Sequence, residues 1–129
     1  MFTAEQIKAA HSKVKSGADF PKYIREIKAL GVRAYETWVK DSQTEYYGDN
    51  EYRTSSSPMY EEKVISNSAD KIKFDYYLKI HQQGETDYLT FCRHCSETGI
   101  VKWFVSLDKM TCTYYDKVEK EILVERIPQ

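Results

Sequence analysis

The sequence predicts an α+β protein in which four helices pack against one antiparallel sheet. Two periodicities and the turns between segments support this prediction. Apolar residues recur at helical spacing in four segments and alternate with polar residues in several others. Short turns join the alternating segments, and strands joined in this way pair antiparallel. We expect the helices to cover one or both faces of the sheet.

Two helices are expected near the start of the chain. Thr3 and Gln6 have the spacing of a capping box, and Gly17 is expected to end the first helix. Asp19 is expected to cap the second helix and Gly31 to end it.

Strands are expected to follow at residues 34–39, at 44–47, and in a third segment that runs through Tyr52. A serine-rich loop at 55–58 precedes a fourth predicted strand at 61–66. The second half of the chain then repeats the order of two helices followed by strands. Helices are expected from Ser68 to Gly84 and from Thr86 to Gly99, with strands at 100–107, 110–115 and 122–127.

The two halves of the chain match each other at an offset of 68 positions. Six identities fall between Asp19 and Tyr52, where average residue frequencies would give about two. They pair Asp19, Arg25, Gly31, Tyr46, Tyr47 and Glu51 with Asp87, Arg93, Gly99, Tyr114, Tyr115 and Glu119. We therefore predict a single domain, residues 1–129, built by tandem duplication of an ααβββ unit (about 3–66 and 68–128). A cleft between such halves is a favoured place for a pocket.

Composition narrows the functional class. The chain has 129 residues with 41% hydrophobic and 30% charged, which excludes collagen, coiled coil and intrinsic disorder. The net charge is −1, so we expect no nucleic-acid partner, because no basic excess would attract its phosphates. The sequence begins without a secretory pattern and holds no apolar run of about 20 residues. We therefore expect a cytoplasmic protein that does not enter a membrane.

Cysteine spacing raises a metal or redox alternative. Cys92 and Cys95 form a C-x-x-C pair that could hold zinc together with Cys112 and His94. The internal match instead aligns Cys92 with Ile24 and Cys95 with a second isoleucine, which favours buried core thiols. We predict no cofactor and keep the zinc site as the alternative.

The histidines carry weaker signals. His11 lies on the apolar face of the first helix and is expected to be partly buried, whereas His81 and His94 are expected at the surface.

Eleven tyrosines make an aromatic binding surface plausible. In a Tyr-Tyr strand one ring faces the core and the other faces outward. Outward rings beside a tryptophan could bind a base, a sugar or a partner protein. The alternative is that these rings cover the sheet, where aromatic residues are favoured. The predicted ligand-binding residues are Trp38, Tyr46, Trp103, Tyr114 and Tyr115.

Two segments resemble a known family. The first is residues 10–21 with Leu30-Gly31-Val32 and Tyr35-Glu36. The second begins at Gly84 and includes Phe91-Cys92, Gly99, Trp103 and residues 110–116. They are similar to the YbcV-like family of small bacterial and prophage-carried proteins, some of which are labelled phage envelope proteins. The resemblance implies one small domain of unknown function and assigns no catalytic residues.

These observations favour a non-enzymatic binding module, either a homodimer or the partner of another protein. The surface would be the aromatic sheet or the cleft between the halves. The first alternative is a small enzyme with a site of Tyr, Asp and Glu in that cleft, for which Glu36 and Asp108 are acid–base candidates. The second is the zinc-binding domain.

Overall fold

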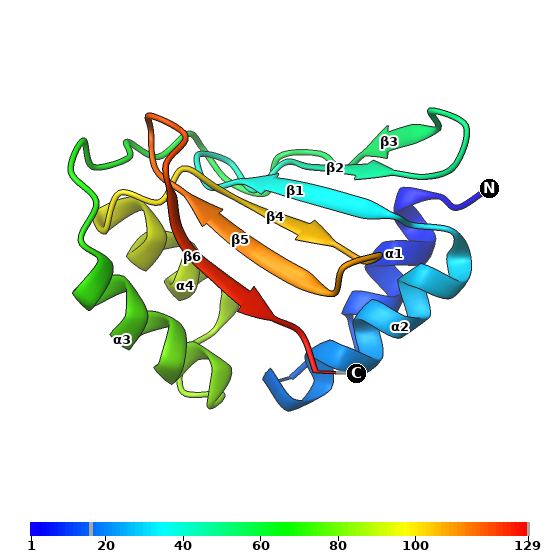
Figure 1. Ribbon diagram of the computed structural model, residues 1–129, viewed down its shortest axis with the longest axis horizontal. Coiled ribbons are helices and arrows are strands. Elements are labelled where there is room, and N and C mark those ends of the chain that lie inside the picture. Colours follow the sequence, from blue (N-terminus) through cyan, green and yellow to red (C-terminus); the bar gives the residue numbers. More distant parts are fainter. Residues whose placement is uncertain (16, 129) are drawn as a thin grey trace.

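The structure is a computed structural model that describes residues 1–15 and 17–128. Its helical elements are α1 (Ala4–His11), a short 3₁₀ turn η1 (Gly17–Asp19), α2 (Phe20–Leu30), α3 (Lys71–Gln82) and α4 (Tyr88–Glu97). Its strands are β1 (Ala34–Trp38), β2 (Thr44–Tyr47), β3 (Arg53–Ser55), β4 (Lys102–Ser106), β5 (Thr111–Tyr115) and β6 (Glu121–Arg126) (Figure 1).

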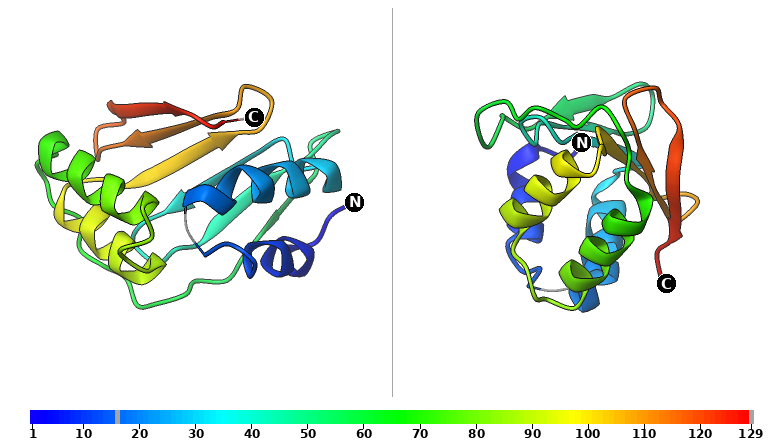
Figure 2. Two further views of the ribbon diagram at one scale, coloured as in Figure 1. Left: turned by 90° about the horizontal axis from the view of Figure 1, so that it is seen from below. Right: turned by 90° about the vertical axis from the view of Figure 1, so that its left-hand side faces the viewer.

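The strands form one sheet in the order β3-β2-β1-β4-β5-β6, and each neighbouring pair is antiparallel. The four α-helices of the described chain lie on the same side of this sheet, with α1 and α2 under one end and α3 and α4 under the other (Figures 1 and 2). The predicted α+β class is confirmed, and the helices cover one face and leave the other uncovered.

Each half of the chain supplies three adjacent strands, so that β1 and β4 meet at the centre. β1 begins at Ala34 and β4 begins at Lys102, 68 positions later. Their register pairs Ala34 with Ser106 and Trp38 with Lys102. Positive φ angles also recur at this interval, at Gly31 and Gly99, Ser42 and Met110, and Glu51 and Glu119.

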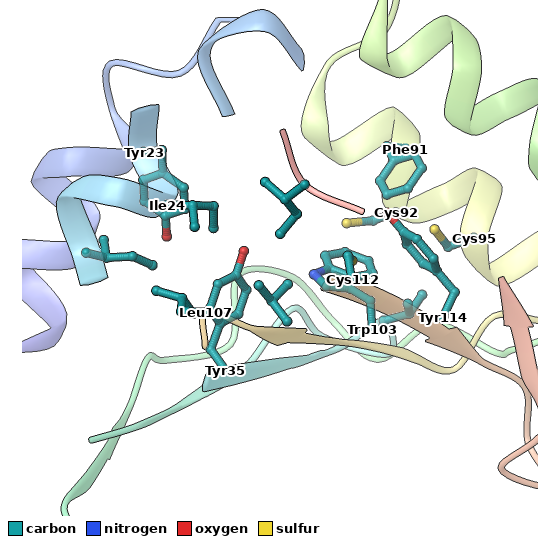
Figure 3. Packing of buried hydrophobic residues seen from close by; sticks show 14 of the residues in the cluster. Tyr23, Ile24, Tyr35, Phe91, Cys92, Cys95, Trp103, Leu107, Cys112 and Tyr114 are labelled. Atoms are coloured by element: carbon teal, nitrogen blue, oxygen red, sulfur yellow. The ribbon is translucent and has the colours of Figure 1, made fainter. Parts of the chain in front are cut away.

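The core lies between the sheet and the helices. Figure 3 shows Ile24 of α2 on one side of this layer, and Phe91 and Cys95 of α4 with Trp103 of β4 on the other. Phe74 of α3 is fully buried and packs against the Phe91 and Tyr114 rings, at 6.3 and 4.9 Å between centroids. Both helix pairs therefore pack against one continuous core.

Helix α1 begins as predicted and ends earlier than predicted. The Thr3 hydroxyl accepts from the Gln6 amide, which completes the capping box. The helix ends at His11, where the Ser12 hydroxyl donates to the Ala9 carbonyl at 2.6 Å and competes with the helical pattern. Gly17 does not end this helix. It allows a close approach to α3, because a Cβ there would lie 2.5 Å from the Gln82 carbonyl oxygen.

The predicted strand at 61–66 is wrong, and the third strand lies at Arg53–Ser55 rather than ending at Tyr52. Residues 56–70 connect the two halves. The Lys63 amide donates to the Lys40 carbonyl and the Ser66 amide to the Ser96 carbonyl, so this segment spans both halves without a strand partner. Helix α3 begins later than expected, with Asp70 as its cap.

Candidate functional site: the open face of the sheet

The alternation of side chains along the central strands defines an uncovered surface. Tyr35 and Thr37 of β1 are buried against the helices, so Ala34, Glu36 and Trp38 point to the other side. On β4, the same alternation buries Trp103 and Val105 and turns Lys102, Phe104 and Ser106 outward. We call this side of the sheet the open face.

Strand register arranges the open face in three rows across the sheet. The bulky row contains Trp38, Lys102, Tyr115 and Glu121. The middle row contains Ser55, Glu45, Glu36, Phe104, Thr113 and Val124. The small row contains Ala34, Ser106, Thr111 and Arg126, and Tyr47 and Arg53 extend it onto β2 and β3.

Lys102 is the centre of the best-defined cluster on this surface. Its ammonium group lies 4.8 Å from the centroid of the Trp38 ring and 5.2 Å from that of Tyr115. It also lies 3.5 Å from the Glu36 carboxylate. The two charged side chains are only 16% and 15% exposed. An ammonium between two rings and a carboxylate is held by cation–π and charge attraction together.

The tyrosine hydroxyls beside this cluster respond to its charge. Partial burial and the Glu36 carboxylate raise the pKa of Tyr47. Partial burial raises the pKa of Tyr115, with further contributions from Glu121 and Glu36. Both phenols therefore keep their protons at neutral pH and can donate hydrogen bonds.

The structure divides the predicted ligand-binding residues between the two faces. Trp38 and Tyr115 lie on the open face, whereas Tyr46, Trp103 and Tyr114 face the helices. The five residues therefore do not form one surface. Their binding role stays a prediction.

Sequence reasoning did not single out Lys102 or Phe104 as binding residues. The usable signal was their position, because each directly flanks the inward-facing Trp103 and must point outward.

Buried side chains lie in the region between the halves where the sequence predicts a cleft. Tyr35 and Trp103 are 6% and 8% exposed (Figure 3). The Tyr88 hydroxyl lies 2.6 Å from the Ser42 hydroxyl, and the Tyr60 hydroxyl donates to the Val39 carbonyl at 2.6 Å. Burial raises the pKa of Tyr35 and Tyr88, so these phenols are poor general bases or nucleophiles at neutral pH.

The three thiols are buried and free, as the core-thiol interpretation predicts: Cys92, Cys95 and Cys112. Burial raises the pKa of each thiol, and that of Cys112 to about 12. A raised pKa opposes the thiolate that metal binding and disulfide exchange require. Within residues 1–15 and 17–128, no group of three His, Cys, Asp or Glu side chains is placed to share a metal ion. The zinc alternative gains no support.

The histidine predictions are partly wrong. His94 is buried rather than at the surface, with 8% exposure and its ring stacked on Tyr77 at 3.7 Å. Its Nδ1 atom lacks a hydrogen-bond partner among the described residues. The His81 ring stacks on Phe91 at 4.4 Å, and its Nδ1 lies 3.1 Å from the Thr86 carbonyl. His11 is exposed, although its ring meets the edge of Tyr23 at 5.1 Å.

Two hollows mark the second half of the molecule. One, of about 590 Å³, lies beside the start of α3. The other, of about 250 Å³, lies between α3 and β6, where Gln82 donates to both oxygens of Glu125 at 3.1 and 3.2 Å. Burial raises the pKa of Glu125, and Asp75 lines the same hollow. This pair of carboxylates lies outside the predicted inter-half site. Neither Glu36 nor Asp108, the acid–base candidates, lines either hollow.

A comparison with protein families identifies the relationship of the chain. The profile of a family described as protein of unknown function (DUF1398) matches residues 8–126. The chain belongs to the DUF1398 family. Comparison of this DUF1398 chain with curated proteins found no match. The YbcV-like relationship, the prophage association and the cytoplasmic location stay predictions.

The helices of this DUF1398 chain are short. Across its described residues, none combines the length and apolar character needed to cross a bilayer.

Proposed function

We propose that this protein is a non-enzymatic binding module and that it binds another protein through the open face of its sheet. The observation that carries the proposal is that helices cover only one face of the sheet. The four α-helices of the described residues pack on one side, and the other side presents Trp38, Tyr47, Phe104 and Tyr115 (Figure 2). Aromatic residues and arginine are enriched where proteins bind each other.

The Lys102 cluster supports this proposal because it is ordered before a partner arrives. The rings of Trp38 and Tyr115 flank the ammonium group, and Glu36 neutralises it. A partner therefore meets aromatic side chains whose rotamers are already restrained, which lowers the entropic cost of binding.

Charge on the open face favours a protein partner over a polyanion. In the three rows, the basic residues are Arg53, Lys102 and Arg126, and the acidic residues are Glu36, Glu45 and Glu121. Three positive charges are balanced by three negative ones. Nucleic acid affinity comes largely from uncompensated positive charge, so a surface of this kind binds it weakly.

Photo-crosslinking in the native host tests the proposal. Benzoylphenylalanine replaces Val124, which is 52% exposed in the middle row, and in a control it replaces Ile72, which is 86% exposed on α3. We expect a defined protein adduct from position 124 and none from position 72. Adding Phe104→Asp should remove the adduct. Equal adducts at both positions, or no adduct at 124 either in the host or with the purified protein at millimolar concentration, would refute this function.

We also propose that the two halves, about 3–66 and 68–128 of a single domain, arose by duplication. The support is the 68-residue interval shared by the strands, the positive φ positions and several backbone hydrogen bonds. The Val39 amide donates to the Val101 carbonyl, and the Leu107 amide donates to the Arg33 carbonyl. Leu107 and Val101 stand 68 positions after Val39 and Arg33, so the hydrogen bonds at the two ends of the β1–β4 pair correspond. A superposition of residues 3–66 on residues 68–128 that fails to align their helices and strands would overturn this origin.

A further inference from the structure

We propose that the partner of the open face is a second copy of this chain, placed face to face about a twofold axis that runs across the strands over the middle row. This inference rests on the proposed function and specifies its partner. In this arrangement the bulky row of each copy lies over the small row of the other. The two sheets pack as in a β-sandwich, with aligned strands about 10 Å apart.

Side-chain size is self-complementary in this register. Along the central pair, Trp38 and Lys102 lie at one end, and Ala34 and Ser106 lie at the other, four residues or about 13 Å away. The twofold axis places Trp38 over the Ala34 of the second copy and Lys102 over its Ser106. On β1 and β4, large side chains thus enter positions where small ones leave room, as isologous interfaces require.

The next strand repeats this match in size. On β5, Tyr115 belongs to the bulky row and Thr111 to the small row. The twofold axis places each Tyr115 over the Thr111 of the other copy. Phe104 lies in the middle row and therefore meets its own counterpart near the axis.

Charge is complementary on the outer strand. Glu121 ends the bulky row on β6 and Arg126 ends the small row. Both side chains are exposed, and neither forms an ion pair inside the described chain. In the dimer each Glu121 faces the Arg126 of the other copy, so the pair occurs twice. Two carboxylates lie in the middle row near the axis, and each already has a cation: Glu36 is paired with Lys102 and Glu45 with Arg53.

The area of the face predicts a weak complex. Six strands about 4.8 Å apart and rows spanning about 13 Å give on the order of 400 Å² of sheet plane per copy. Standard interfaces bury about 800 Å² per partner. We therefore expect a reversible dimer with a dissociation constant of roughly tens to hundreds of micromolar.

This register is tested by reversing the charges of Glu121 and Arg126. Analytical ultracentrifugation of the full chain, at concentrations up to millimolar, measures the dissociation constant of the dimer. Glu121→Arg and Arg126→Glu should each weaken self-association about tenfold, because two attractive pairs become repulsive. The double variant restores opposite charges and should regain wild-type association. Glu85→Arg, in the turn between α3 and α4, changes the charge equally and should have no effect. Thermal melts confirm that each variant is folded.

The outcomes separate the inference from the proposed function. Loss in both single variants and rescue in the double variant supports the face-to-face dimer. The face-to-face dimer is overturned if the chain is monomeric at every concentration. It is also overturned if neither charge reversal changes the dissociation constant. If the chain is monomeric and crosslinking at position 124 captures a different protein, the dimer is refuted and the open face remains a binding surface. If crosslinking also fails, both are refuted.

Discussion

Removing the Lys102 ammonium tests whether the open-face cluster is ordered in the free protein. Lys102→Met keeps most of the side-chain volume and leaves the Glu36 carboxylate without its cation. Breaking a fully buried ion pair costs about 3–5 kcal/mol. Since the two side chains retain 16% and 15% exposure, we expect a smaller loss, about 2 kcal/mol of unfolding free energy.

The reciprocal change should cost less. Glu36→Gln keeps the shape of the side chain, and Lys102 keeps its contacts with the Trp38 and Tyr115 rings. We expect a loss of about 1 kcal/mol. In the double variant no charge is left unpaired, so its loss should fall short of the sum of the single losses by about 1 kcal/mol.

Urea unfolding followed by tryptophan fluorescence measures these losses, at low protein concentration so that association does not contribute. Lys109→Met, an exposed lysine in the turn between β4 and β5, is the matched control and should change the free energy by about 0.5 kcal/mol or less. Strictly additive losses, or a Lys102→Met loss equal to that of the control, would show that the cluster does not form.

Three further predictions follow from the interior. Gly99→Ala adds a Cβ at 2.7 Å from the Ser68 carbonyl oxygen at a φ of +80°, and should cost about 3 kcal/mol in thermal unfolding. Gly31→Ala, with a nearest contact of 3.6 Å, should cost about 1–2 kcal/mol, and equal losses would contradict this reasoning. Burial, with a contribution from Arg93, lowers the pKa of His94 below 6.5, so the stability it supports is present above 6.5 and is lost as pH falls through the folded-state pKa. His94→Phe should therefore reduce the loss of unfolding free energy on acidification, and an unchanged loss would refute the assignment. The native thiols should resist a disulfide reagent until urea unfolds the chain and then all react, whereas rapid native reaction would show an accessible thiolate: Cys92, Cys95 and Cys112.

Local signals account for what could be predicted about the helices and central strands. Helix caps and left-handed glycines involve only a few consecutive residues, so the local sequence is enough to predict them. The caps are at Thr3 and Asp87, and the left-handed glycines are Gly31 and Gly99. Periodicity likewise placed β1 and β4 correctly, because one face of each strand is buried.

The sequence-based predictions were wrong where contacts between distant residues outweighed the local sequence pattern. Residues 61–66 have the composition of a strand, yet their hydrogen bonds go to Lys40 and Ser96 from different halves. His94 lies on an otherwise readable helix, and only the packing of α3 against α4 buries its ring under Tyr77. Neither contact leaves a periodic trace in the sequence.

Some features of the candidate site could likewise be predicted from local sequence, and others depend on contacts between distant segments. The sequence alone determined that the two rings of a Tyr-Tyr strand face opposite sides, because alternation along a strand is a property of its backbone. Only the tertiary structure decided which side lacks helices and that β1 lies beside β4. That register brings Lys102 from one half to Trp38 of the other, since strands far apart in sequence become neighbours only when the whole sheet forms.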